Sequence, residues 1–141
     1  MLRVMGFHLL FFARHVYLCC KQLSKWFQIF SNSSKKLVLG LMIRDRTGHV
    51  IWGTNTWHTH QVIDQVRAGE RIVFTFEFEC ALGPDSYSVS PALVSSNTHL
   101  EDNYEWTDNL FVFDVINTDK DFFIGTTLLD GAFTIQRAQV Q

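Results

Sequence analysis

Hydrophobic and polar side chains alternate most regularly in the stretch from Arg71 to Cys80. A strand places successive side chains on opposite faces, so strict alternation over this length predicts a half-buried strand with one face in water. The apolar face is aromatic-rich and consists of Ile72, Phe74, Phe76, Phe78 and Cys80. Burial of each Phe would contribute roughly 1.5–3 kcal/mol to folding.

Further runs of this kind predict more strands. Residues 37–43 are apolar at nearly every position, and a polar turn over 44–48 leads into 49–53, which predicts a hairpin. Residues 87–94, with Pro91 marking an edge or a bulge, 109–116, 122–124 and 132–135 complete the expected set. Only 61–68 favours a short helical turn. About seven strands with frequent turns predict an all-β fold, an antiparallel β-sandwich of immunoglobulin-like or jelly-roll-like type.

Charge divides the chain into two segments. Residues 1–36 carry six basic side chains and no acid, whereas residues 37–141 carry six basic against fourteen acidic side chains, a net charge of −8. We therefore expect an atypical basic, apolar segment over 1–36 and a β-sandwich domain over 37–141. The first segment is compatible with an organelle transit peptide, a membrane-surface helix, one or two buried strands, or a non-native start of the reading frame.

Composition excludes several classes of function. The chain of 141 residues is 47% hydrophobic with a net charge of −2, which is typical of one globular domain and does not indicate a nucleic-acid partner. It holds no Walker A motif and no G-x-S-x-G motif, so we expect neither an enzyme nor a cofactor. Three cysteines form no disulfide framework and favour a reducing compartment.

Two loop segments, 52–60 and 99–109, concentrate side chains suited to binding. An aromatic ring can cover the C–H face of a pyranose while amides, imidazoles and carboxylates pair with its hydroxyls. The expected carbohydrate-binding residues are Trp57, His58, His60, Tyr104, Trp106 and Asp108. Trp52 lies within a predicted strand and is expected to be a core aromatic.

A metal site is the alternative interpretation of His58 and His60. On a strand their side chains would share a face, and Asp64 and Gly69 follow in a near miss to the cupin pattern of two histidines, a glutamate and a glycine. A metal-dependent, cupin-like enzyme is therefore a second hypothesis, although two ligands without a third make a weak site.

Four blocks of sequence carry a family resemblance. They are residues 39–56, which include Gly53-Thr54-Asn55-Thr56, residues 68–76, residues 87–93, and residues 106–115, which begin Trp106-Thr107-Asp108-Asn109. In order and spacing the chain, over about residues 37–130, resembles the C-terminal domain of Wzt, the ATP-binding subunit of O-antigen polysaccharide ABC exporters.

The resemblance implies a β-sandwich that binds O-antigen polysaccharide at the cytoplasmic face of the inner membrane. It implies recognition of the modified, non-reducing end of the glycan for export, with no catalysis, and subunits that work in pairs beside the exporter's membrane subunit. The chain does not include the family's nucleotide-binding domain, and residues 1–36 do not resemble the strands expected before Leu37. A non-functional fragment of the exporter subunit is therefore a further alternative.

Overall fold

The computed structural model describes the backbone of residues 8–10, 17–19, 23–30, 34–96, 103–118 and 120–138, and side chains within 35–96, 104–118 and 120–138. The described residues form ten strands and no helix, and hence no helix that could cross a membrane. The strands are β1 (His8–Leu10), β2 (Tyr17–Cys19), β3 (Leu23–Phe30), β4 (Ser34–Asp45), β5 (Val50–Asn55), β6 (Ile63–Val66), β7 (Arg71–Phe78), β8 (Asp85–Val94), β9 (Asn103–Trp106) and β10 (Phe111–Ile116).

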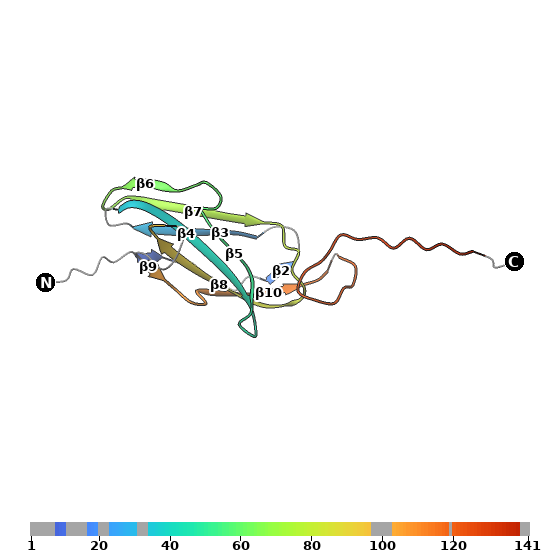
Figure 1. Ribbon diagram of the computed structural model, residues 1–141. Coiled ribbons are helices and arrows are strands. Elements are labelled where there is room, and N and C mark those ends of the chain that lie inside the picture. The colour runs from blue at the N-terminus through green and yellow to red at the C-terminus, as the bar shows by residue number, and fades with distance from the viewer. Residues whose placement is uncertain are drawn as a thin grey trace.

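The strands form two layers (Figure 1). One sheet has the order β1-β3-β7, and the other has the order β2-β10-β8-β4-β5, with β6 paired to β4 and β9 paired to β8. Strand β4 is the longest, and its beginning pairs with β6 whereas its remainder pairs with β8 and β5. The all-β sandwich expected from the sequence is confirmed, with β4 to β10 as its seven strands from residue 34 onward.

The core lies between the two layers and follows from period-two alternation. Strand β4 contributes Leu37, Leu39, Leu41 and Ile43 to the core, although Val38 and Gly40 on its other side are buried as well. Strand β7 faces the same core with Ile72 and the three Phe residues of its apolar face. Sheet neighbours β8 and β10 add Tyr87, Val89, Leu93, Phe111, Phe113 and Val115. Because the side chains of one face come from alternate positions, the opposite positions of β4, β8 and β10 form the outer face of the sheet.

Two local predictions are wrong. Residues 63–66, within the predicted helical turn, form strand β6 instead. They do so because Ile63 and Val66 pack on the core while the backbone pairs with the start of β4. Residues 122–124 and 132–135, expected as short strands, belong to no strand. Phe122, Ile124, Phe133 and Ile135 are exposed, and Phe123 is half-buried. Strand formation requires a partner with free backbone groups, and residues 132–135 have none among the described residues.

Pro91 does not mark an edge or a bulge. It is fully buried in the central strand β8, opposite Leu41 of β4. A proline is tolerated here because the other neighbour of β8 changes at this point: β10 pairs as far as Val89, and β9 begins at Ala92. At Pro91, neither β10 nor β9 therefore needs a hydrogen bond from the N–H that proline lacks. The Pro91 carbonyl accepts a hydrogen bond from Thr107 N at 3.1 Å.

The basic N-terminal segment includes three strands. Strand β3 pairs antiparallel with β7 from Leu23↔Phe78 to Phe30↔Arg71, and β2 pairs parallel with β10. The described backbone of this segment thus forms three strands, where the sequence suggested one or two, and no helix. The division at residue 36 stays a prediction, although β4 begins at Ser34.

The chain leaves the sandwich as an extended arm (Figure 1). Gly83 N donates to Thr126 O at 3.0 Å and Leu128 N to Ala81 O at 2.7 Å, which anchors the arm beside the end of β7. A Cβ on Gly83 would lie 2.2 Å from the Gly125 oxygen, so this close approach requires glycine. Beyond the anchor, Leu129, Phe133 and Ile135 are 83%, 99% and 83% exposed.

Tyr87 joins the core to the loop before β8. Its ring stacks on Phe113 with centroids 5.6 Å apart, and its hydroxyl donates to the Gly83 carbonyl at 2.9 Å. Burial, followed by the nearby Asp85 charge, raises the pKa of Tyr87 to about 12. The folded state therefore holds the neutral phenol more firmly than the unfolded chain does.

We expect Tyr87→Phe to change the alkaline stability profile. A raised pKa contributes stability that is complete below the ordinary pKa of 10.0 and is lost as pH rises toward about 12. The variant should lose about 1 kcal/mol near neutral pH through the missing hydrogen bond. Its stability should then fall less steeply than that of the wild type across the alkaline window, as measured by urea unfolding at a series of pH values. Parallel profiles would contradict the assignment.

Candidate functional site

The outer face of the larger sheet carries a row of residues that the strand register aligns. Trp106 of β9 lies opposite Ala92 of β8, which lies opposite Gly40 of β4, which lies opposite Asn55 of β5. Cross-strand neighbours in register share a face. The row therefore has a large ring at one end, an amide at the other, and two of the smallest residues between them. Strand spacing separates the two end backbones by roughly 14 Å.

A groove of about 330 Å³ lies over this row. Its floor continues in the next row with Ser90 and Gly53, and Met42 and Val50 add apolar surface toward the β4–β5 turn. A Cβ added at Gly40 would lie 3.7–3.8 Å from its nearest neighbours, which is ordinary contact. A Cβ would therefore be accepted at this position, and its absence in glycine leaves the groove open.

Hydrogen bonds fix the Trp106 wall. Trp106 Nε1 donates to Asp108 Oδ1 at 2.9 Å, and Arg44 Nη1 donates to the same oxygen at 3.2 Å. Arg44 Nη1 also donates to Ser90 Oγ at 2.9 Å, and this hydroxyl accepts from Asn109 N at 2.9 Å. Asn109 has a φ of 49°, a left-handed conformation that asparagine tolerates better than most residues. The turn after β9 is thus bound to the sheet floor, and the indole is held in one orientation.

The loop after β5 brings His58 to the groove. Thr56 exchanges hydrogen bonds with Leu39 of β4, through Thr56 N to Leu39 O at 2.9 Å and Leu39 N to Thr56 Oγ1 at 3.1 Å. His58 N donates to Asn55 Oδ1 at 2.9 Å, and His58 lines the groove beside Asn55. The loop therefore adds an imidazole at the amide end of the row.

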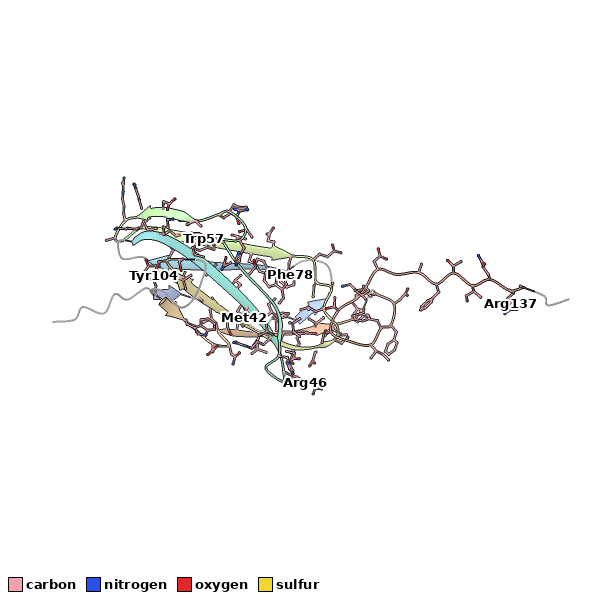
Figure 2. The ribbon with its side chains drawn as sticks, in the orientation of Figure 1. Met42, Arg46, Trp57, Phe78, Tyr104 and Arg137 are labelled. Carbon is pink, nitrogen blue, oxygen red and sulfur yellow. The ribbon has the colours of Figure 1, made fainter. Side chains whose placement is uncertain are left out.

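The structure brings together three of the six expected binding residues. His58 and Trp106 line the groove, and Asp108 orients Trp106. Trp57 instead lies beneath the Lys36 ammonium, 5.1 Å from its ring centroid, and His60 is exposed in a turn. Tyr104 packs on the core and donates to Lys36 O at 3.3 Å. Figure 2 labels Trp57 and Tyr104 apart from Met42, and neither Trp57 nor Tyr104 is among the residues that line the groove.

Sequence reasoning missed the floor of the groove. Gly40, Gly53, Ser90 and Ala92 carry no obvious chemistry, and their role depends on being small in adjacent rows. Asn55 and Arg44 stood in the quoted family block without being chosen as site residues. Assigning them needs the register of three strands, which one sequence pattern does not supply.

The metal interpretation loses its geometric basis. His58 and His60 lie in a turn and not on a strand, and His60 has a φ of 59°, so the shared strand face is absent. Within the part of the chain that the structure describes, no three His, Cys, Asp or Glu side chains gather in a way that could hold a metal ion.

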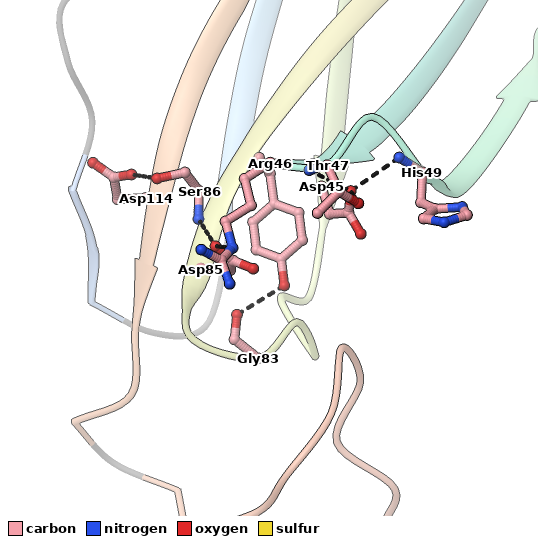
Figure 3. A network of polar contacts seen from close by, with 9 residues as sticks. Asp45, Arg46, Thr47, His49, Gly83, Asp85, Ser86 and Asp114 are labelled. Atoms are coloured by element: carbon pink, nitrogen blue, oxygen red, sulfur yellow. Dashed lines mark hydrogen bonds and ion pairs between the residues drawn. The ribbon is translucent and has the colours of Figure 1, made fainter.

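A second hollow of about 600 Å³ follows along the same face. It lies over the first part of β8, at Ser86 and Ser88, and reaches the β4–β5 turn. That turn is held by Asp45, whose Oδ1 accepts from Thr47 N, Thr47 Oγ1 and His49 N at 2.7–2.9 Å (Figure 3). The hydrogen bond from the Thr47 side chain is the largest cause of a lowered pKa for Asp45.

Other hollows lie at the open edge between β5 and β7. One of about 450 Å³ is lined by Trp52, Phe76, Phe78 and other mainly apolar residues. Trp52 stacks on Phe76 with centroids 5.2 Å apart, but Trp52 is 38% exposed, so it is not the core aromatic that the sequence predicted. A further hollow of about 390 Å³ at this edge is lined by several polar side chains, among them Thr54, Thr59 and Gln61. We prefer the outer groove because its Trp106 ring is held in place by a hydrogen bond to Asp108.

The fold and the groove define a class of small β-sandwich domain with an open, aromatic-walled groove on the outer face of one sheet. The family model described as Wzt C-terminal domain matches residues 22–129, and the chain belongs to this family. The match includes β3, and so begins earlier than the resemblance noted from residue 37.

A solved structure supports the same fold. The chain is similar to the crystal structure of the C-terminal domain of Wzt, with a TM-score of 0.72 and 18% sequence identity. The similarity covers 95% of this chain and 83% of that one. The comparison with curated proteins gives no match.

We expect Gly40→Val to fill the groove without unfolding the domain. The Cβ has room, Gly40 does not have a positive φ, and valine is favoured in strands. The free energy of unfolding should stay the same or rise by up to about 1 kcal/mol. Thermal unfolding followed by circular dichroism measures this. A clear loss of stability would mean that the floor is more tightly packed than the Cβ contacts indicate.

Proposed function

We propose that the chain binds O-antigen polysaccharide, through its modified non-reducing end, in the groove between Trp106 and the Asn55–His58 pair. The observation that carries this proposal is the arrangement of one fixed indole facing an amide and an imidazole over a floor of glycine and alanine. Family membership supports the same ligand, because the resemblance implies polysaccharide recognition for export.

The chemistry of the groove suits a sugar ring. The indole face offers a flat apolar surface for the C–H groups of a pyranose, and the Asn55 amide and the His58 imidazole offer polar groups for its hydroxyls. Small floor residues let the ring approach the sheet closely. A few polar groups in a mainly apolar concave surface fix the orientation of a ligand.

Binding without catalysis is the function that these residues support. The described lining of the 330 Å³ groove contains no carboxylate, whereas glycoside hydrolysis requires a pair of them flanking the bond. Asp108, beside the groove, accepts hydrogen bonds from Trp106 and Arg44. As the family resemblance implies, we propose that the domain acts as a recognition module at the cytoplasmic face of the inner membrane, beside the membrane subunit of an ABC exporter.

The test is a binding measurement with three variants. Calorimetric titration with O-polysaccharide from the strain that encodes the chain should show binding by the wild type. Trp106→Ala should bind roughly tenfold more weakly or worse, because loss of a covered aromatic face costs about 1.5 kcal/mol or more. Gly40→Val should also bind weakly, because its side chain occupies the floor.

Trp57→Ala is the matched control, since it removes an indole outside the groove. It should bind as the wild type does. Loss of binding in Trp57→Ala with normal binding in Trp106→Ala would move the site to the β5–β6 loop. No binding by the folded wild type would overturn the proposal.

The arm supports a homodimer. Leu129, Phe133 and Ile135 are almost fully exposed on an extended segment that leaves the sandwich. Contiguous apolar surface of this kind on a soluble domain marks an interaction site. We assign a second copy of the chain as the partner, in agreement with the paired subunits that the family resemblance implies.

We expect Phe133→Ser combined with Ile135→Ser to convert the dimer to a monomer. Light scattering after gel filtration should give about twice 16.3 kDa for the wild type and 16.3 kDa for the variant. Stability of the sandwich itself should change by less than about 0.5 kcal/mol, because both side chains are in water. Arg137→Ser, in the same arm, should remain dimeric. A wild type that is monomeric at high concentration would contradict the assignment.

A further inference from the structure

The outer face of β8 carries a continuous strip of small side chains. Ser86, Ser88, Ser90 and Ala92 occupy alternate positions on the side of β8 opposite the core residues Tyr87, Val89 and Leu93. Ser86 and Ser88 are half-buried, whereas Ser90 and Ala92 form a buried floor. From Ala92 to Ser86 the strip is roughly 20 Å long. The 330 Å³ groove lies over its last part and the 600 Å³ hollow over its first part.

The Arg44 side chain lies between the two hollows. Arg44 projects from β4 opposite Ser88, and its Nη1 reaches Ser90 of β8 and Asp108 beyond it. Nε and Nη2 of Arg44 make no hydrogen bond to the residues that the structure describes. Because only Nη1 is hydrogen-bonded, the three N–H groups on Nε and Nη2 can donate to a ligand that lies over Arg44.

The second hollow has its own binding chemistry. Ser88 opposes Val112 of β10, so a hydroxyl and an apolar patch lie side by side. Arg46 pairs with Asp85 at 3.3 Å, and Ser86 bonds both to Asp85, through its backbone N–H, and to Asp114, through its hydroxyl (Figure 3). This ion pair is largely exposed on the arginine side, so it contributes little and can exchange for ligand contacts.

The charges around the second hollow select the ligand class. The lining of the hollow contains two arginines, Arg44 and Arg46, and two aspartates, Asp45 and Asp108. Arg44 pairs with Asp108, and Arg46 pairs with Asp85 outside the lining. The charges of the lining therefore balance, which gives an anionic ligand no advantage over neutral hydroxyls. Hydroxyl donors and acceptors with one apolar patch are the features that match an uncharged sugar segment.

We propose that the 600 Å³ hollow is a second subsite that binds the next neutral sugar residues of the same polysaccharide, with Arg44 contacting the chain between the two subsites. The inference rests on the proposed function of the first groove and extends it. The domain then binds a glycan segment along β8 and not only a terminal residue. Affinity should increase with the length of the oligosaccharide until both subsites are filled.

The test compares fragment lengths. Partial hydrolysis of the O-polysaccharide gives non-reducing-end fragments of one repeat and of several repeats, and calorimetry gives the affinity of each for the full chain. The longer fragment should bind the wild type about tenfold more tightly, which corresponds to one or two net hydrogen bonds. Ser88→Tyr, which fills the second hollow, should remove this gain and leave the affinity for the short fragment unchanged.

Ser88→Thr is the control, since it keeps the hydroxyl and adds one methyl group, and it should keep most of the length dependence. Equal affinity of the wild type for short and long fragments would overturn the second subsite and leave the first groove standing. The same conclusion follows if Ser88→Tyr is folded, judged by its thermal midpoint, and retains the full gain. Failure of both fragments to bind the wild type would overturn the proposed function and this inference together.

Discussion

The register of β8 between its neighbours is the constraint on which both the core and the candidate site depend. One set of alternate positions, including Tyr87, Val89 and Leu93, fills the space between the sheets. The other set consists of three serines and an alanine and forms the floor of the groove. If the register of β8 shifted by one residue, its serines would face the core and the Tyr87 ring would face water. The apolar set therefore fixes the outer floor without any ligand being present.

Pro91 shows how this register is compatible with an irregular neighbour. The central strand exchanges β10 for β9 at the proline, so the change of partner occurs where a backbone donor is missing. The turn between these two partners carries Asp108 and Asn109, and it is bonded to Ser90. The break in the ladder thus positions the loop that holds the Trp106 wall. A continuous partner strand would leave no room for that loop beside the floor.

The sequence predicted the layers better than the site. Alternation identified β7, and the polar turn identified the β4–β5 hairpin, because both signals are local. Strand β6 was missed because its partner, the start of β4, lies far away in sequence. The arm was mistaken for strands because its apolar residues resemble buried ones, although they are exposed. Loop chemistry selected His58, Trp106 and Asp108, which lie at the candidate groove, together with Trp57, His60 and Tyr104, which do not line it. An irregularity in the β8–β9 register leaves Tyr104 packed on the core and Trp106 in the groove, and no local pattern signals such a shift.

The contacts of Arg44 matter more for positioning the residues around the groove than for the stability of the fold. The pair with Asp108 is partly exposed, and such pairs contribute roughly 0–1 kcal/mol. Its geometry has a larger consequence, because Asp108 Oδ1 accepts from both Arg44 and the Trp106 indole, while Ser90 Oγ bonds both Arg44 and the Asn109 backbone. Two oxygen atoms, Asp108 Oδ1 and Ser90 Oγ, therefore connect the Trp106 wall, the groove floor and the Arg44 side chain. Residues joined in one network do not act independently, so removal of Asp108 disturbs the orientation of Trp106 and the placement of Arg44 at the same time. The strand register determines the shape of the groove. The hydrogen-bond network then fixes the Trp106 ring on one side of the groove and orients the Arg44 donors beside it.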